Sequence, residues 1–548
     1  MSKDVSRRDF IKVASATAGA ATIATGFNPL AYAANEKVNI AMIGTGGQGT
    51  YHIKEGLAHT PDSQIVAIAD FYSAHQKSGM IFGQCSNAGI GFQAGEDPRN
   101  LPAAEMAKAK AALRPKGYHD YKEMLANEDI DAVVVATPLD THHQIVMDCL
   151  DAGKYVLCEK TMTMTIEQAR DIVKKCHETG KWVMVGHQRR YNPRYNLAVQ
   201  LAYEAGELGR ITNINAQWHR NSFWRRNYDV TYDQLPALDK QYITEGGLDR
   251  HLNWRMYNDR SGGLFTELAT HQTDIANWFM RGVPTKVRAF GGLDYWRDGR
   301  EADDNITIMY EYEQNPGDAG FMAMESRSVQ QEKVAIRKKY NVRFAYSCTL
   351  SNAHMGTSEL IQGDKGAIKI TEDHFGDSAY FIEPWYAMEK KKAADAKAAE
   401  EAGLASGDGT EAKSNDMSSG ASLMNIGKGS EGIRLLYTKK LLEANTYQHH
   451  ALAHHIKNGG TPRTNQMVGL TTTIGAVAAL ESRKQDKTIT VNPADYQFDF
   501  ETPSFFEHDM NVDDYEDDPI LVKEVEDKKA AAAAEAEAAA KEAEAAKA

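Results

Sequence analysis

Two stretches of the chain carry side chains whose types suit proton transfer at neutral pH. Glu267 and His271 lie four residues apart, and in a helix they would share one face. A histidine suits a general base because its pKa lies near neutrality, and the carboxylate of Glu267 would orient or polarise it. Lys160 follows an apolar run and would hydrogen-bond a substrate hydroxyl, which makes removal of the hydroxyl proton easier. An ordinary Glu–His pair on a helix surface and a surface lysine are the alternatives.

A glycine-rich turn indicates a cofactor for this chemistry. The apolar residues 38–43 run directly into the sequence Gly44-Thr45-Gly46-Gly47-Gln48-Gly49. In a dinucleotide-binding turn the first glycine permits a tight turn, the second leaves room for a pyrophosphate, and the third lets the next helix pack closely. The run 64–70 ends in Asp70, which is placed to bind ribose hydroxyls. Because Asp70 would repel a 2′-phosphate and no cation follows it, we expect NAD rather than NADP. The alternative is a glycine-rich turn in some other α/β protein.

Strands and helices must alternate to position these groups. Residues 35–186 show this alternation, with strands expected at 131–137, 155–159 and 182–186 and a helix at 165–179. Such a pattern is typical of a parallel sheet covered on both faces, which binds ligands at the carboxyl ends of its strands. We therefore expect cofactor contacts after two of the strands, from Thr137, Pro138 and His142 and from Glu159 and Lys160. A Pro-initiated turn that caps the next helix is the alternative for the first group. The segment 79–117 reads as an unusually long loop.

The pattern changes at about residue 187. Strand-like runs follow one another at 211–218, 286–291, 305–312 and 321–325, and helices are expected at 447–457 and 465–483. We therefore predict an α/β protein with two domains, a Rossmann dinucleotide-binding domain over 35–186 and a second α/β domain over 187–500. The second domain would be built on a large, mostly antiparallel open sheet. Residues 388–432 read as a low-complexity insertion, and 501–548 as an acidic, then Ala/Glu/Lys-rich tail.

The first 33 residues read as a signal peptide. A twin-arginine pair, Arg7-Arg8, precedes a weakly apolar run and the small-x-small sequence Ala31-Tyr32-Ala33. We therefore expect residues 1–33 to direct export through the twin-arginine translocation machinery to the periplasm or another extracytoplasmic space. The net charge of −13 argues against nucleic-acid binding, and no later stretch is apolar and long enough to cross a bilayer. The five cysteines lack metal-ligand spacing, and we expect no metal site.

These motifs, in this order and spacing, resemble the Gfo/Idh/MocA family, named for glucose-fructose oxidoreductase and inositol dehydrogenase. The resemblance runs from about 37 to 290 and more loosely to about 490. The matching pieces are the glycine turn, Ala136-Thr137-Pro138 with His142, Glu159-Lys160, Gly186-His187-Gln188-Arg189-Arg190-Tyr191, and Gly262-Gly263 with Glu267 and His271.

The resemblance implies hydride transfer between a nicotinamide and a sugar or cyclitol carbon that bears a hydroxyl. Lys160 would polarise the reacting oxygen and His271 would accept its proton. The open sheet of this family often mediates oligomers, so a homo-oligomer is expected. Two positions depart from the family pattern: Thr161 replaces the usual proline, and Glu267 is one methylene longer than the usual aspartate.

The second domain also offers side chains that suit a sugar ring near the expected cleft. A tryptophan face surrounded by hydrogen-bonding groups is typical of carbohydrate sites. The candidates are Arg189, Tyr191, His219, Asn221, Trp224, Arg225 and Arg255. Packing at the rim or in the core is the alternative for this group.

These observations lead to an exported, NAD-dependent carbohydrate oxidoreductase with a tightly bound cofactor. A second hypothesis is a glycosidase or lyase that oxidises a ring hydroxyl transiently and then eliminates the aglycone. The similar glycosidases lack the lysine, so Lys160 favours net oxidoreduction. A third hypothesis is a non-enzymatic scaffold on the same fold, which the intact glycine turn, Lys160 and His271 disfavour.

Overall fold

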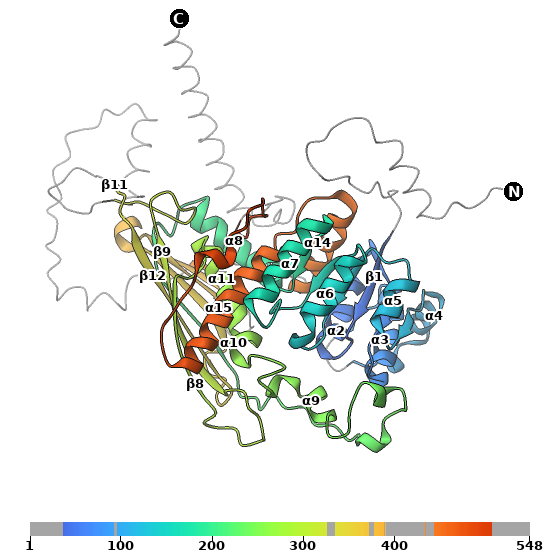
Figure 1. Ribbon diagram of the computed structural model, residues 1–548. Helices are drawn as coiled ribbons and strands as arrows, with labels where there is room; N and C mark the ends of the chain where they lie inside the picture. The colour runs from blue at the N-terminus through green and yellow to red at the C-terminus, as the bar shows by residue number, and fades with distance from the viewer. Residues whose placement is uncertain are drawn as a thin grey trace, which may run out of the picture.

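The computed structural model describes residues 37–92, 96–325, 335–371, 378–387, 390, 433–434 and 443–506. The predicted signal peptide, almost all of the predicted insertion and the tail from 507 onward lie outside the described residues. In the described part, no helix is long and apolar enough to cross a membrane. Figure 1 shows the strand β1 and its helices beside a second, larger sheet, with α10, α11 and α15 between the two.

The first sheet is the predicted parallel sheet. Its six strands run in the order β3-β2-β1-β4-β5-β6, and the order reverses between β1 and β4, where such sheets bind ligands. The strands are Val38–Ile43 (β1), Ser63–Ala69 (β2), Lys116–Tyr118 (β3), Ala132–Val135 (β4), Tyr155–Cys158 (β5) and Val183–Val185 (β6). The principal helices are α2 (Gly47–Tyr51), α3 (Ser73–Asn87), α5 (Tyr121–Asn127), α6 (His142–Asp151) and α7 (Ile166–Thr179). β1 and β4 are buried along their whole length, which explains their continuous apolar sequences.

The prediction of a long loop over 79–117 is wrong. α3 continues to Asn87, and a further helix, α4, spans Ala103–Ala111. The glycines of α3 allow close packing: a Cβ at Gly79 would lie 2.8 Å from the Thr45 side chain, and one at Gly83 would lie 2.9 Å from Pro115. Glycine therefore marks tight contacts of this helix rather than a loop.

In the described residues, the second sheet has nine strands in the order β16-β15-β14-β13-β7-β12-β9-β8-β17. Neighbouring strands pair antiparallel except β7 and β12, which pair parallel. The strands are Ile211–His219 (β7), Lys286–Gly292 (β8), Asn305–Gln314 (β9), Tyr340–Thr349 (β12), Thr357–Gly363 (β13), Gly366–Thr371 (β14), Ala379–Ile382 (β15), Ile433–Arg434 (β16) and Ile489–Thr490 (β17). The strand predicted at 321–325 is reduced to Met324–Glu325 (β10), paired with Ala335–Ile336 (β11).

Helices cover one face of this sheet and join it to the first domain. They are α8 (Pro193–Tyr203), α10 (Leu264–Glu267), α11 (Ala269–Met280) and α15 (Gln466–Gln485). α15 packs against α7 of the first domain and against β8 and α11 of the second. α14 (Ala444–Asn458) returns to the first domain, where Leu452, Ala453 and Ile456 join the core of the parallel sheet. The segment assigned to the second domain thus completes the first one.

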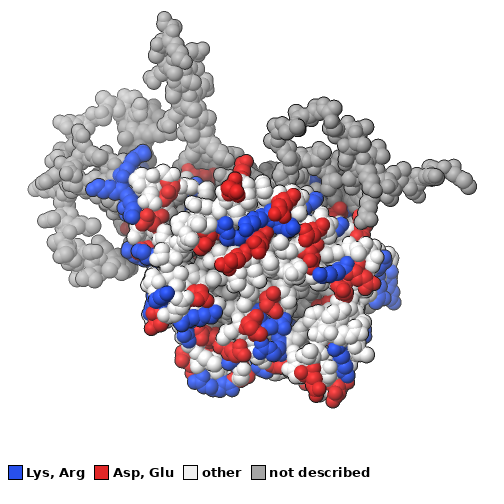
Figure 2. Space-filling view, viewed as in Figure 1, with Lys and Arg blue, Asp and Glu red and all other residues white. Residues whose placement is uncertain are grey.

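One long connection of the second domain also reaches the first. Residues 220–261, which we call the strap, leave the end of β7, run beneath the parallel sheet and return at α10. The strap includes the short helix α9 (Leu248–Leu252), visible at the bottom of Figure 1. On the face shown in Figure 2, acidic and basic side chains are interspersed rather than gathered by sign.

Candidate active site

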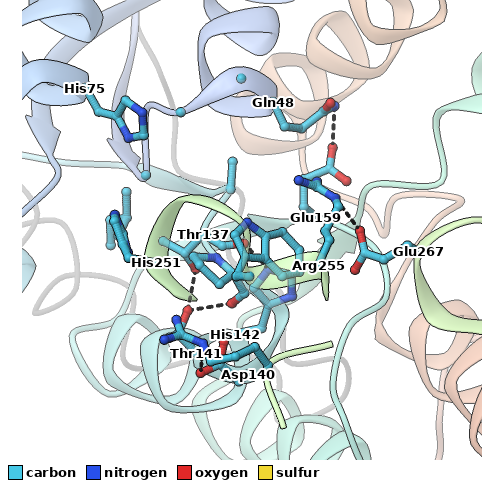
Figure 3. A pocket seen from close by; sticks show the side chains of 18 of the residues that line it. Gln48, His75, Thr137, Asp140, Thr141, His142, Glu159, His251, Arg255 and Glu267 are labelled. Atoms are coloured by element: carbon cyan, nitrogen blue, oxygen red, sulfur yellow. Dashed lines mark hydrogen bonds and ion pairs between the residues drawn. The ribbon is translucent and has the colours of Figure 1, made fainter. Parts of the chain in front are cut away.

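A cavity of about 730 Å³ lies at the carboxyl ends of the parallel strands and extends under the second domain. His75 and His251 lie at one end of it, and Gln48, Glu159 and Glu267 at the other (Figure 3). The sequence-predicted residues that line it are Gly44, Gly46, Gly47, Gln48, Asp70, Thr137, Pro138, His142, Glu159, Lys160, Trp224, Arg255, Glu267 and His271. The structure therefore brings the glycine turn and the candidate proton-transfer residues to one cavity.

The glycine turn has the shape that a dinucleotide requires. Gly44 has a φ of 84°, and a Cβ there would lie 2.8 Å from the carbonyl oxygen of Ala136. A Cβ at Gly49 would lie 2.0 Å from the carbonyl oxygen of Gly44, so only glycine permits this close packing. Gly46 and Gly47 face the cavity, whereas Thr45 is buried behind the turn. The residues present thus fit a bound pyrophosphate.

Asp70 ends β2 at the far side of this turn. Its carboxylate accepts hydrogen bonds from the backbone N–H groups of Thr45 and Tyr72, both at 2.9 Å. Burial raises the pKa of Asp70, but hydrogen bonds and the nearby His75 more than offset this and lower the pKa overall. The carboxylate is therefore ionised, and no lysine or arginine of the described residues pairs with it. Such a group accepts hydrogen bonds from a ribose 2′-hydroxyl and repels a 2′-phosphate.

Glu159 holds a buried network behind the cavity wall. Its Oε1 accepts from Gln48 Nε2 at 2.9 Å and lies 2.8 Å from His52 Nε2. His52 Nδ1 in turn lies 2.9 Å from Nε2 of His449, on α14. Burial raises the pKa of Glu159, but the hydrogen bond and charge of His52, together with Lys160, hold it at about 2. The first domain and α14 are thus joined directly beneath the candidate site.

His142 joins the two loops from which cofactor contacts are expected. Its ring is buried, with Nε2 3.0 Å from the carbonyl oxygen of Thr137 and Nδ1 3.0 Å from that of Thr161. The first carbonyl follows β4 and the second follows β5. His142 therefore fixes the loops to each other while it lines the cavity.

Lys160 is aimed at α10. Its Nζ donates to the carbonyl oxygen of Glu267 at 2.7 Å and lies 3.9 Å from the Oε2 atom of Glu267. Thr161, which follows through a cis peptide bond, donates its hydroxyl to the carbonyl oxygen of Thr266 at 2.7 Å. Burial lowers the pKa of Lys160 from 10.5, and the carboxylates of Glu267 and Glu159 oppose this. Thr161 thus ties the lysine loop to α10.

The single helix expected to carry Glu267 and His271 is interrupted. α10 ends at Glu267, Leu268 departs from helical geometry, and α11 begins at Ala269. The Glu267 carboxylate accepts from Arg255 Nε at 2.9 Å, and no hydrogen bond joins it to His271 in the described part of the chain. The expected contact between Glu267 and His271 is therefore not formed among the described residues, and the carboxylate faces Arg255 and Lys160 instead.

His271 is a buried, neutral base. Its ring lies 5.3 Å from Trp218 and 6.4 Å from His187, measured between ring centroids. Burial, with Lys160 and Arg189 nearby, lowers its pKa well below 6.5. Its buried Nδ1 atom has no hydrogen-bond partner among the described residues. A neutral imidazole and a lysine donor in one cavity provide the two groups needed to deprotonate a hydroxyl.

Several predicted substrate contacts lie elsewhere. Arg189 is buried and its Nη1 lies 2.5 Å from Glu359 Oε1, and Tyr191 is buried beside Thr464. Three other predicted substrate contacts also lie outside the cavity lining, namely His219, Asn221 and Arg225. These five predicted substrate contacts therefore lie outside the lining of this cavity, whereas Trp224 and Arg255 line it.

Sequence reasoning missed much of the second-domain wall. The residues of this wall that were not predicted are Trp218, Arg220, Arg226, His251, Leu252, Trp254, Arg260 and Leu268. Most of these residues lie in the strap, which has no helical or strand periodicity. The dense run of aromatic and arginine residues over 218–226 is the signal that would have indicated Arg220 and Arg226. Trp224 adopts a φ of 61°, a conformation that bulky residues rarely take and that recurs at ligand sites.

No group of three or more His, Cys, Asp or Glu side chains in the described ranges is arranged to hold a metal ion. All five cysteines are buried and unpaired with one another. Burial raises the pKa of the Cys149 thiol, and the same cause raises that of Cys176. These thiols therefore belong to the packed interior.

Comparison with known proteins agrees with this geometry. Residues 38–187 match the model of an oxidoreductase family with an NAD-binding Rossmann fold, and residues 197–324 match the GFO/IDH/MocA C-terminal domain. An inositol 2-dehydrogenase of Rubrobacter xylanophilus is 30% identical over 263 residues, which cover 48% of this chain and 60% of that protein. This chain thus spans less than two thirds of the length of that relative.

Solved structures share the fold at low identity. Aldose-aldose oxidoreductase from Caulobacter crescentus, complexed with glycerol, superposes with a TM-score of 0.54 at 16% identity, covering 83% of this chain and all of that one. A levoglucosan dehydrogenase in complex with NADH and levoglucosan gives 0.52 at 16% identity over the same shares. From the two family models, the order of the parallel strands and the glycine turn, the chain belongs to the Gfo/Idh/MocA oxidoreductase family.

Proposed function

We propose that the protein is an NAD-dependent oxidoreductase acting on a CH–OH group of a sugar, glycoside or cyclitol. The observation that carries this proposal is the placement of Lys160 and His271 in the same cavity as the glycine turn and Asp70. Relatives named as inositol 2-dehydrogenases support the choice of a polyhydroxylated substrate.

Each protein group has a defined part in the proposed reaction. His271, neutral because its pKa is lowered, accepts the hydroxyl proton of the substrate. Lys160 donates a hydrogen bond to the same oxygen and stabilises the negative charge that develops on it. Gly44, Gly46 and Asp70 hold the dinucleotide, and a bound NAD would supply the acceptor for the hydride that leaves the carbinol carbon.

The substrate end of the cavity suits a sugar ring. Trp218, Trp224 and Trp254 line it, and aromatic faces pack against the apolar faces of sugars. Arg255 is held by Glu267 at 2.9 Å, so its remaining N–H groups are oriented for hydroxyl contacts. Lys160 favours net oxidoreduction over elimination, because the similar glycosidases lack this lysine.

The test begins with the nucleotide. Mass spectrometry of the material released by denaturing the purified protein should find NAD or NADH. Nicotinamide absorbance is then followed as cyclitols, aldoses and glycosides are added, and the products are identified. Lys160→Met and His271→Ala should abolish reduction of the nicotinamide, while the exposed Lys174→Ala serves as a matched control. A protein that neither contains nor binds NAD(H) or NADP(H) would refute the proposal, and a cleaved glycoside as the main product would favour the elimination chemistry.

We include export and self-association in the proposal. Arg7-Arg8 and Ala31-Tyr32-Ala33 support passage of the folded protein through the twin-arginine machinery to an extracytoplasmic space. Replacing both arginines by lysine should trap the protein in the cytoplasm, as fractionation with a cytoplasmic marker would show. Light scattering on the purified protein would test the expected homo-oligomer.

A further inference from the structure

The strap is attached to the first domain beside the dinucleotide site. Asp239 is fully buried, and its carboxylate accepts hydrogen bonds from the backbone N–H (3.0 Å) and the hydroxyl (2.5 Å) of Ser73, at the start of α3. Leu235 and Ile243 of the strap share a small apolar core with Tyr72. The strap is therefore fixed to the loop that follows Asp70.

Between this attachment and β7, the strap passes over the glycine turn. Asn253 fixes the backbone of Arg226 through two hydrogen bonds. Oδ1 of Asn253 accepts from the Arg226 N–H at 2.6 Å, and Nδ2 of Asn253 donates to the carbonyl oxygen of Arg226 at 3.2 Å. The guanidinium reaches the turn itself, because a Cβ at Gly47 would lie 2.4 Å from Nη2 of Arg226. A side chain of the second domain thus covers the part of the first domain that would hold a pyrophosphate.

Arg226 differs from other arginines of the strap in its partners. Arg225 pairs with Asp249, Arg255 with Glu267, and Arg260 with Asp140. Within the described ranges, no carboxylate lies within ion-pair distance of the Arg226 guanidinium. Arg226 is exposed overall, and partial desolvation of its guanidinium together with the neighbouring Arg255 lowers its pKa. An anion bound at the glycine turn would supply the missing charge.

We infer that Arg226 binds the pyrophosphate of NAD from the second domain, so that the strap closes over the cofactor and holds it in place. The inference rests on the NAD of the proposed function, and it assigns to Arg226 the retention of that NAD. Arginine suits this role because its planar fork binds phosphate oxygens in pairs. Release of the nucleotide then requires movement of the strap, whose attachment at Asp239 and Ser73 opposes that movement.

The test measures binding rather than turnover. Protein stripped of nucleotide is titrated with NADH, ADP-ribose and adenosine, and release of bound NADH is timed by fluorescence during a chase with excess NAD. Arg226→Ala should weaken NADH and ADP-ribose about 10- to 100-fold, the change expected for loss of one charged hydrogen-bonding partner, and should speed release similarly. Adenosine, which has no phosphate, should bind unchanged. Arg226→Lys should recover part of the loss, because it restores the charge but not the fork.

Arg250→Ala is the matched control, because Arg250 lies on the same strap and pairs with the exposed Asp259 instead of the turn. It should leave all three affinities unchanged. Equal losses for adenosine and ADP-ribose in Arg226→Ala would show a merely structural role and overturn the inference, as would an unchanged affinity for ADP-ribose. A wild-type protein that binds none of the three nucleotides would overturn both this inference and the proposed function. A protein that binds NADH through Arg226 but oxidises no carbohydrate would overturn the proposed function alone.

Discussion

The Glu159→Gln substitution removes one negative charge from the cavity wall and keeps the size of the side chain. Glu159 is buried, and its carboxylate is held by Gln48, His52 and the backbone N–H of Lys160. These partners hold its pKa at about 2, although burial alone would raise it above the ordinary 4.5. Glutamine cannot ionise, so the variant should lose the part of the stability that depends on this carboxylate.

The magnitude follows from the two pKa values. The pKa of Glu159 falls from 4.5 in the unfolded chain to about 2 in the folded protein. At about 1.36 kcal/mol for each unit of pKa, the ionised group contributes on the order of 3 kcal/mol to the free energy of unfolding. Because the folded pKa is the lower one, this contribution is complete above about pH 4.5 and disappears as the pH falls toward about 2. Between about pH 6 and about pH 3, the wild type should lose on the order of 2 kcal/mol more than the variant.

Urea unfolding followed by circular dichroism at several pH values measures this difference. Glu123→Gln is the matched control, because Glu123 is exposed on α5, and it should follow the wild type at every pH. His52→Phe should also reduce the pH dependence, since the His52 hydrogen bond makes the largest contribution to lowering the pKa of Glu159. Identical slopes of stability against pH in the wild type and Glu159→Gln would refute the reasoning.

Three further predictions concern catalysis, cofactor and core. Because the pKa of His271 lies well below 6.5, the base stays neutral through pH 6.5, so kcat/KM should fall only at lower pH. His271→Ala should reduce kcat about 10²- to 10⁴-fold, and a pH profile with its acid limb at or above 6.5 would contradict the assignment. Gly49→Ala places a Cβ 2.0 Å from the Gly44 carbonyl oxygen and should abolish NADH binding in a fluorescence titration, whereas retained affinity would show that the turn can move. Asp274→Asn leaves the buried Arg190 guanidinium, now bonded to Asp274 at 2.7–3.0 Å, without its counter-ion. It should cost about 3–5 kcal/mol in urea unfolding, and a loss below about 1 kcal/mol would exclude this role.

Local patterns were sufficient for the parallel sheet and its cofactor turn. β1 and β4 are continuous apolar runs because both faces of the sheet are covered, and the glycine turn and Asp70 follow strands at the expected places. The error at α3 has a physical cause, since Gly79 and Gly83 resemble loop residues in sequence but serve close contacts with Thr45 and Pro115. Glycine alone does not distinguish these two uses.

The candidate site was only partly predictable, because its second wall depends on contacts between distant residues. Arg189 is neutralised by Glu359, and Tyr191 meets Thr464, partners that lie far along the chain. No local pattern identifies such pairs, so both side chains looked available for a substrate. For Arg226 the error was an omission. Arg226 contacts the glycine turn in the fold but lies far from it in the sequence, so no local pattern indicated the contact.

The return of α14 to the first domain affects how the chain folds during synthesis. The last strand of the parallel sheet ends at Val185, but α14, which covers part of this sheet, begins at Ala444. At about 5–20 residues per second, a ribosome takes roughly 13–50 s to make the intervening residues. Through that interval the nascent sheet exposes the apolar surface that Leu452, Ala453 and Ile456 later bury. Such surface binds chaperones or aggregates, so the N-terminal domain of this protein becomes a finished folding unit only after α14, which ends at Asn458, has been translated.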